Sequence, residues 1–85
     1  MNLPLFGSDP NPQPIRVDQV TVGTDLVVDF GDGLRCFRVT KREILATTDE
    51  SGNETLTYIL HSGRHMMGVP EGEMMKKVGP HGPPI

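Results

Sequence analysis

The prolines of this chain gather at its two ends, and this distribution limits the fold more than any other feature of the sequence. Of the eight prolines, four lie in the first fourteen residues, three lie in the last six, and one lies at position 70. Proline has no backbone N–H and restrains the residue before it, so neither end can form a helix or an interior strand. We therefore expect residues 1–14 to be an extended arm, residues 15–78 to be the folded domain and residues 79–85 to be a disordered tail.

Between these ends, short runs of β-branched and aromatic residues alternate with glycine, aspartate and asparagine. This pattern is typical of strands and turns. The runs at 26–30 and 34–40 flank Gly31-Asp32-Gly33, whose glycines suit a tight turn, and this predicts a β-hairpin. The second run is expected to continue to residue 45 as one long strand, with a bend near Lys41-Arg42 where the alternation changes phase.

Two further turns predict the rest of the sheet. A polar turn at 49–54 leads into a run of strong β-propensity at 55–61, and a second turn at 62–64 leads into 65–69. One short helical turn is expected at 70–73, before a last strand at 74–78. The sequence therefore predicts an all-β domain of four or five antiparallel strands, with one short helical turn before the last strand.

The strand order and the end of this domain resemble small SH3-like barrels, which include the Tudor and KOW modules. The resemblance covers about residues 20–78, and the run from Val69-Pro70 to Val78 is similar to the V-P-x-x-x-L-x-x-V ending common in such barrels. It implies a small SH3-like barrel that binds a ligand rather than catalysing a reaction, although a fold does not select the ligand. The aromatic cage of Tudor modules is not expected, because most of the four aromatic residues are needed in the core.

Composition and length exclude several classes of function. Eleven acidic and eight basic residues give a net charge of −3, so nucleic acid would have to bind a local patch. No run approaches the roughly 18 apolar residues of a membrane span, and prolines stand where a secretory signal would be. We expect a cytoplasmic protein that does not bind a membrane.

The residues that could carry chemistry are few. The single cysteine, Cys36, cannot form an internal disulfide, and it is expected to pack in or near the core rather than act as a nucleophile. His61 and His65 are spaced so that, with Cys36 or His81, they could hold a metal ion. Polar residues of a turn are the simpler interpretation, because no cysteine pair completes a zinc set. We expect no enzyme activity, no cofactor and no metal.

Half of the basic residues lie in one predicted strand, and they are Arg35, Arg38, Lys41 and Arg42. Alternation places Arg38 and Arg42 on the face opposite Phe37 and Val39, so they should face solvent or a partner. This basic strand could contact the phosphates of a nucleic acid. A solvated strand face that deters edge pairing is the alternative that we favour.

Four of the five methionines form two adjacent pairs, Met66-Met67 and Met74-Met75. Adjacent residues of a strand point to opposite faces, so each pair should direct one thioether inward and one outward. The outward thioethers would form an adaptable apolar surface. We interpret this surface as a protein interface, either with a second copy of the chain or with another protein.

The segment Asn2-Leu3-Pro4-Leu5-Phe6 places three large apolar residues in an arm that has no evident core to enter. It resembles the pentapeptide Q-L-x-L-F, by which many bacterial replication and repair proteins bind the sliding clamp of DNA polymerase. The resemblance implies that Leu3, Leu5 and Phe6 are apolar anchors and that Asn2 is the polar one. The alternative is that Leu5 and Phe6 fold back and cap the barrel.

Together these features predict a non-catalytic protein–protein interaction module that binds or modulates a cytoplasmic partner protein, which could be a second copy of the chain or a replication protein. The expected partner-binding residues are Leu3, Leu5, Phe6, Met66, Met67, Met74 and Met75. The alternative function is a small barrel that binds nucleic acid through the basic strand.

Overall fold

The structure is a computed structural model that describes residues 3–6 and 10–79. In this part of the chain there are seven strands and one three-residue 3-10 helix, η1 (Val17–Gln19). The strands are β1 (Gln13–Arg16), β2 (Asp25–Asp29), β3 (Leu34–Arg38), β4 (Lys41–Thr48), β5 (Glu54–Ser62), β6 (His65–Pro70) and β7 (Met74–Lys77). The predicted all-β class is confirmed.

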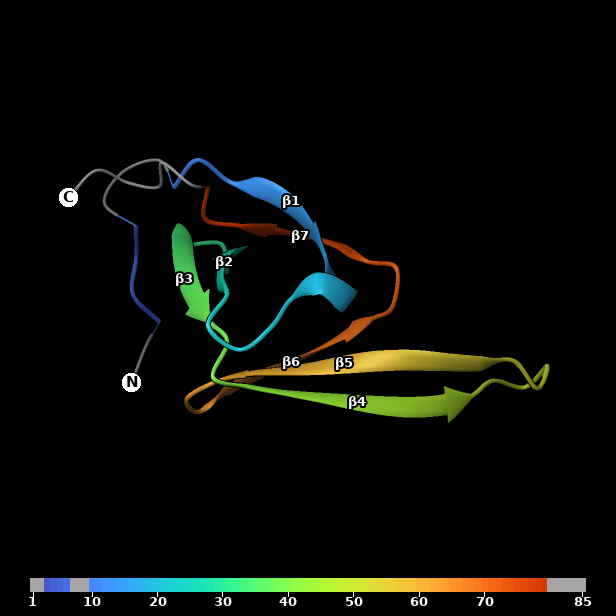
Figure 1. Ribbon diagram of the computed structural model, residues 1–85. Coiled ribbons are helices and arrows are strands. Elements are labelled where there is room, and N and C mark those ends of the chain that lie inside the picture. Colours follow the sequence, from blue (N-terminus) through green and yellow to red (C-terminus); the bar gives the residue numbers. More distant parts are fainter. Residues whose placement is uncertain (1–2, 7–9, 80–85) are drawn as a thin grey trace.

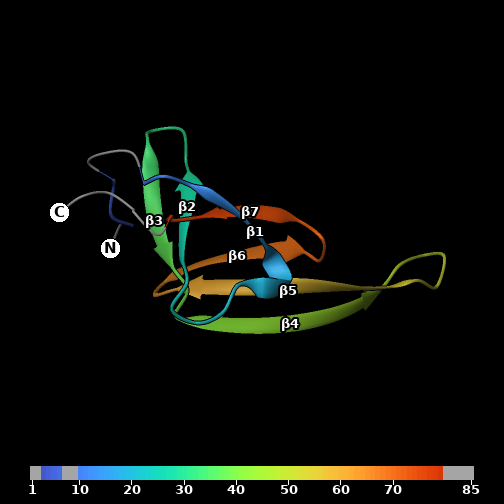
Figure 2. The ribbon, with the colours of Figure 1, turned by 45° about the horizontal axis from the view of Figure 1, so that its top comes forward.

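The strands form two antiparallel sheets (Figure 1). The four-stranded sheet has the order β1-β7-β2-β3, and the three-stranded sheet has the order β4-β5-β6. Figure 2 shows that β2 and β3 run across the direction of β4 and β5, so the two sheets cover each other only in part. In the described residues, no strand of one sheet pairs with a strand of the other.

The core lies where the two sheets and the loop around η1 meet. Its buried hydrophobic residues are Leu3, Val17, Val20, Leu26, Phe37, Val39, Tyr58, Leu60 and Val69. Phe37 and Val39 are buried and Arg38 is exposed, as the alternation predicts. Val17 is the first residue of η1 and Val20 follows its last, so that three residues per turn place both side chains on the same side and hence in the core.

The predicted hairpin of β2 and β3 is present, with all five residues of each strand in register. Gly31 and Gly33 have φ values of 92° and 129°, which L-residues with a side chain rarely adopt. The Gly31 N–H donates to the Asp29 carboxylate at 2.7 Å and closes the turn. The hairpins of β4 with β5 and of β5 with β6 also follow the predicted turns.

The long bent strand expected over residues 34–45 is two strands of different sheets. Between β3 and β4, the Val39 N–H donates to the Thr24 carbonyl at 2.9 Å, next to the four-stranded sheet. The Thr40 N–H instead donates to the His61 carbonyl at 2.8 Å, in the three-stranded sheet. The bend lies close to its predicted place, but it moves the chain from one sheet to the other. This division and the extra strand β1 give seven strands instead of four or five.

The helical turn expected before the last strand is misplaced. Residues 71 and 72 form a hydrogen-bonded turn, in which the Glu73 N–H donates to the Pro70 carbonyl at 3.2 Å and Gly72 has a φ of 84°. The 3-10 helix is η1, between β1 and β2. No helix in the described part of the chain is long and apolar enough to cross a membrane.

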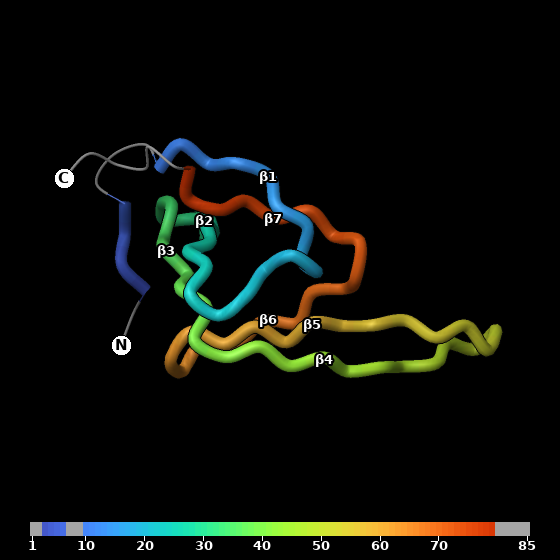
Figure 3. Tube along the Cα trace, in the orientation of Figure 1, coloured from blue at the N-terminus to red at the C-terminus, as the bar shows by residue number. Residues whose placement is uncertain are grey.

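The hairpin of β4 and β5 extends well beyond the rest of the molecule (Figure 3). β6 pairs with β5 only as far as Thr57, so the far half of the hairpin has no third strand. We call residues 44–56 the projecting end. Ile44 and Leu45 lie at its start, and each is 53% exposed. The projection accounts for the extents of 48 × 26 × 24 Å.

Candidate functional site

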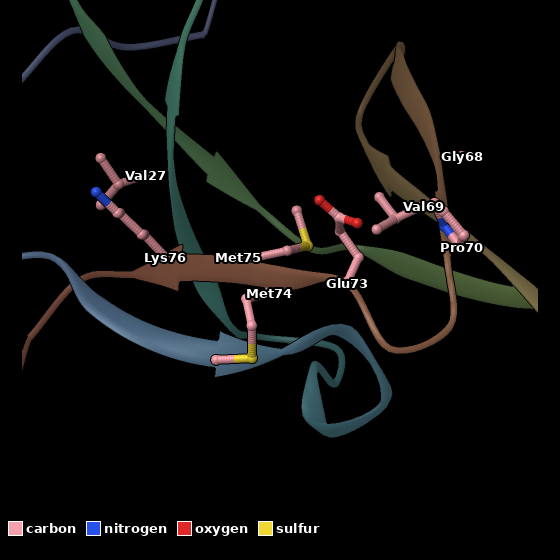
Figure 4. A pocket seen from close by; sticks show the side chains of 8 residues that line it. All are labelled: Val27, Gly68, Val69, Pro70, Glu73, Met74, Met75 and Lys76. Carbon is pink, nitrogen blue, oxygen red and sulfur yellow. The ribbon is translucent and has the colours of Figure 1, made fainter.

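An open cavity of about 510 Å³ lies at the corner where β6 leads into β7 (Figure 4). We call it the β6–β7 groove, and it is lined by Val27, Gly68, Val69, Pro70, Glu73, Met74, Met75 and Lys76. The lining comes from β2, β6, β7 and the turn before β7. Its position therefore depends on the packing of the two sheets and not on one segment.

The two methionines of the groove lie on opposite sides of β7. Figure 4 shows that the Met75 thioether points to the same side as the Glu73 carboxylate, whereas the Met74 thioether points toward β1. Met74 is 54% exposed, and Met75 is half-buried and packs against the core. The outward half of this pair is the part of the groove that a partner could cover.

The other methionine pair has the same alternation but a different location. Met66 is 67% exposed and Met67 packs against the core. They pair with His61 and Leu60 in the three-stranded sheet and do not line the groove. The structure therefore divides the four methionines between two surfaces. Sequence reasoning did not find Val27, Val69 or Pro70 as lining residues, although Val69-Pro70 belongs to the noted closing pattern.

The chemistry of the groove suits binding. Valine, proline and thioether groups form much of the wall. Glu73 adds a carboxylate between Met75 and Val69, and Lys76 adds an ammonium on the side of Val27 (Figure 4). Methionine side chains have three rotatable bonds and adapt to the shape of an apolar ligand. An apolar wall with a few polar groups is the usual lining of a recognition site.

The N-terminal segment 3–6 lies along β3. The Cys36 N–H donates to the Pro4 carbonyl at 2.8 Å, and the Phe6 N–H donates to the Leu34 carbonyl at 3.0 Å. Leu5 forms a bridge with Arg35. Segment 3–6 thus extends the edge of the four-stranded sheet.

The three predicted anchors of this segment have different surroundings. Leu3 is 7% exposed and belongs to the core, Leu5 is exposed and Phe6 is half-buried. The Arg35 guanidinium also donates to the Leu3 carbonyl at 2.6 Å. The segment therefore folds back through Leu3, whereas the sequence alternative assigned that role to Leu5 and Phe6. Asn2, the expected polar anchor, lies outside the described residues.

The predicted basic strand is divided between the two sheets, with Arg35 and Arg38 in β3 and Lys41 and Arg42 in β4. Three of these residues form ion pairs, which are Arg35 with Asp32 at 2.6 Å, Arg38 with Asp25 at 2.7 Å and Lys41 with Glu43 at 3.0 Å. The stripe is thus neither continuous nor free of carboxylates.

These ion pairs lower the pKa of each carboxyl. The hydrogen bond from Arg38 lowers the pKa of Asp25, and the hydrogen bond from Arg35 lowers that of Asp32. Hydrogen bonds from Lys41 and, secondarily, from His61 lower the pKa of Glu43. All three carboxylates therefore remain charged at neutral pH and reduce the positive potential that a phosphate would encounter.

Arg42 has no ion pair among the described residues, and its surroundings differ from those of the other three. Its guanidinium carbon lies 5.0 Å from the centre of the Tyr58 ring, within the range of a cation–π contact. Its Nε is buried and has no hydrogen-bond partner. Arg42 thus covers the edge of the core at Tyr58.

Cys36 is poorly suited to act as a nucleophile. Burial raises the pKa of its thiol, and the charge of Asp25 raises it further. A thiol with a raised pKa is mostly protonated at neutral pH, and the thiolate is the reactive form. Among residues 3–6 and 10–79, no group of three His, Cys, Asp or Glu side chains could hold a metal ion. His81, a candidate ligand in the sequence, is outside these ranges.

The chain was compared with known proteins in three ways. No family model, no curated protein and no solved structure matches it.

Proposed function

We propose that this protein is a non-catalytic protein–protein interaction module, which holds an apolar segment of a cytoplasmic partner protein in the β6–β7 groove. One observation carries the proposal. Met74 directs a large, adaptable apolar side chain to solvent next to a hollow whose other walls are Val69 and Pro70. An exposed apolar side chain beside a cavity with partly apolar walls leaves apolar area that a partner can bury, at about 25 cal/mol per Å².

The fold is proposed to be related to the SH3-like barrels. Two crossed antiparallel sheets around one core, with β7 closing the chain after Val69-Pro70, support this relation. Modules of that kind generally bind ligands, which agrees with a groove whose walls include valine, proline and thioether groups.

Two other expected partners have weaker support. The basic residues are less suited to bind nucleic acid, because three of them already form ion pairs with Asp25, Asp32 and Glu43. A sliding clamp could bind Leu3 only after segment 3–6 left β3, because Leu3 lies in the core. The groove requires no such rearrangement.

Affinity capture from the native cells tests the proposal, with Met74→Glu as the disruptive variant. A glutamate in place of Met74 would introduce a charge into the apolar wall, and a charge is costly to bury in a complex. Met66→Glu is the matched control, because Met66 is even more exposed but lies outside the groove. Equal melting temperatures would show that both variants are folded.

We expect the unchanged protein and Met66→Glu to retain the same stoichiometric partner and Met74→Glu to lose it. Loss of the partner in both variants would mean that the interface includes Met66 as well as Met74. Recovery of the partner with Met74→Glu, or recovery of no partner with the unchanged protein, would contradict the proposal.

A further inference from the structure

The outer edge of β4 is the longest unpaired strand edge in the described part of the chain. β4 has eight residues, is the first strand of the three-stranded sheet and pairs only with β5. Unpaired edges of this kind can pair with another strand, and natural proteins usually cover or disrupt them. Figures 1 and 2 show β4 on the outside of the molecule over its whole length.

The hydrogen bonds at the ends of the β4–β5 ladder identify the backbone groups that face outward. The Asp49 N–H donates to the Asn53 carbonyl at 2.9 Å, which continues the pairing of Thr47 with Thr55. In an antiparallel pair, alternate residues direct their backbone groups to the partner and the residues between them direct theirs away. Residues 41, 43, 45 and 47 therefore bond to β5, and residues 42, 44, 46 and 48 have free backbone groups at the edge.

The charges along β4 are arranged so that the strand complements itself. The strand begins with Lys41-Arg42, continues through the apolar Ile44-Leu45-Ala46 and leads to Asp49-Glu50 in the following turn. An antiparallel copy centred on Leu45 would place Lys41 opposite Asp49 of the second copy and Ile44 opposite Ala46. Arg42 and Glu43 would then face threonines, so no like charges would be opposed.

We propose that two copies of this chain associate through their β4 edges, antiparallel and with Leu45 on the two-fold axis, to form a continuous six-stranded sheet. The outward groups of residues 42, 44, 46 and 48 would form about eight hydrogen bonds between the copies. The two Leu45 side chains would meet at the axis on the outer face of the sheet. This inference uses a different surface from the β6–β7 groove and does not rest on the proposed function.

The two neighbouring registers, centred on Ile44 and on Ala46, are less favourable. Centring on Ile44 would place Glu43 opposite Leu45, a charge against an apolar residue. Centring on Ala46 would place Glu43 opposite Asp49, two like charges. The charge pattern therefore selects one register, because like charges directly opposite are destabilising in a sheet.

A cysteine scan at the axis tests both the dimer and its register. Leu45→Cys, Ile44→Cys and Ala46→Cys would each be made in a Cys36→Ser background and exposed to a mild thiol oxidant. In the proposed register only residue 45 faces itself, at the Cβ separation that a disulfide needs. We expect rapid covalent dimerisation of Leu45→Cys, at least tenfold faster than that of the other two variants. Fastest cross-linking at residue 44 or 46 would overturn the register.

Sedimentation and amide exchange test the association without cross-linking. The unchanged protein should dimerise as its concentration rises. The amides of Ile44 and Ala46 should then become protected from hydrogen exchange in the dimer. The amide of Leu45, which bonds to β5, should be protected at all concentrations. Leu45→Glu should remain monomeric, Lys41→Glu should dimerise about tenfold more weakly, and Met66→Glu should dimerise normally. A monomer at millimolar concentration, or normal dimerisation of Leu45→Glu, would overturn the proposal.

Two of the glutamate variants also separate this proposal from the proposed function. Met74→Glu should lose the captured partner and keep the dimer, whereas Leu45→Glu should lose the dimer and keep the partner. Loss of both properties in one variant would contradict the assignment of two separate surfaces.

Discussion

β4 and β5 form both the base of the three-stranded sheet and its projecting end, yet the surroundings of the two ends differ sharply. At the base, Tyr58 and Leu60 are buried against the four-stranded sheet and β6 pairs with β5. At the start of the projecting end, Ile44 and Leu45 are exposed, and from the pairing of Ala46 with Leu56 onward no third strand is present. The comparison separates residues that hold the fold together from residues of similar type that are free to contact a partner.

The largest expected effect is at the base. Leu60→Ala should lower the free energy of unfolding by about 3 kcal/mol, because Leu60 has no exposed surface and its loss leaves a cavity. Leu45→Ala in the projecting end is the matched control and should change it by less than about 0.5 kcal/mol. Urea denaturation at low protein concentration, where the protein is monomeric, measures both. Equal losses would remove the distinction between the two ends.

Segment 3–6 provides a second comparison of a buried and an exposed leucine. Leu3→Ala should lower the free energy of unfolding by about 2 kcal/mol because Leu3 packs in the core, whereas Leu5→Ala should lower it by less than about 0.5 kcal/mol. Thermal melts of the two variants test this. A Leu3→Ala protein as stable as Leu5→Ala would mean that the segment is free to bind a partner groove.

Arg42 lies at the boundary between the base and the projecting end. Arg42→Ala should cost about 1 kcal/mol, through loss of the Tyr58 contact and of the packing of the side-chain stem. Arg42→Met keeps an unbranched apolar side chain and removes the unpartnered Nε, so it should recover most of this loss. Chemical denaturation of the two variants tests this. An Arg42→Met protein less stable than Arg42→Ala would mean that the charge is the essential feature.

The smallest expected effect is at the exposed ion pair of Arg38 and Asp25. The hydrogen bond from Arg38 lowers the pKa of Asp25, so this carboxylate stabilises the fold above its unfolded pKa of about 3.9. The contribution is lost as the pH falls through the lower folded value. Asp25→Asn should reduce the melting temperature by about 2 °C at pH 7 and by less at pH 3. A larger reduction at pH 3 would contradict the assignment.

Local patterns predicted the hairpins, while features that depend on contacts between distant segments were missed. Gly31 and Gly33 mark their turn directly, and strand alternation predicts that one methionine of each pair faces outward. The transfer of the chain between sheets at Val39 and Thr40 depends on hydrogen bonds to Thr24 and His61, which the sequence does not reveal.

The candidate site was predictable only in part for the same reason. Met74 and Met75 were expected at a surface, but Val27 joins them only because β2 lies beside β7. The ion pair of Arg38 with Asp25 could have been foreseen, since the turn at Gly31–Gly33 sets them opposite each other in the hairpin. The burial of Leu3 could not have been foreseen, because nothing in a proline-rich arm indicates where the arm packs on the domain.

The central claim is that the partner binds at Met74 and not across all the exposed methionines, and methyl NMR tests it most directly. With ¹³C-labelled methionine methyl groups, each methionine gives a separate signal that can be followed as the captured partner is added. We predict that the Met74 and Met75 signals shift or broaden in proportion to the partner bound, while the Met66 signal is unchanged. A change confined to Met66, or no change in any methionine signal at saturation, would contradict the claim.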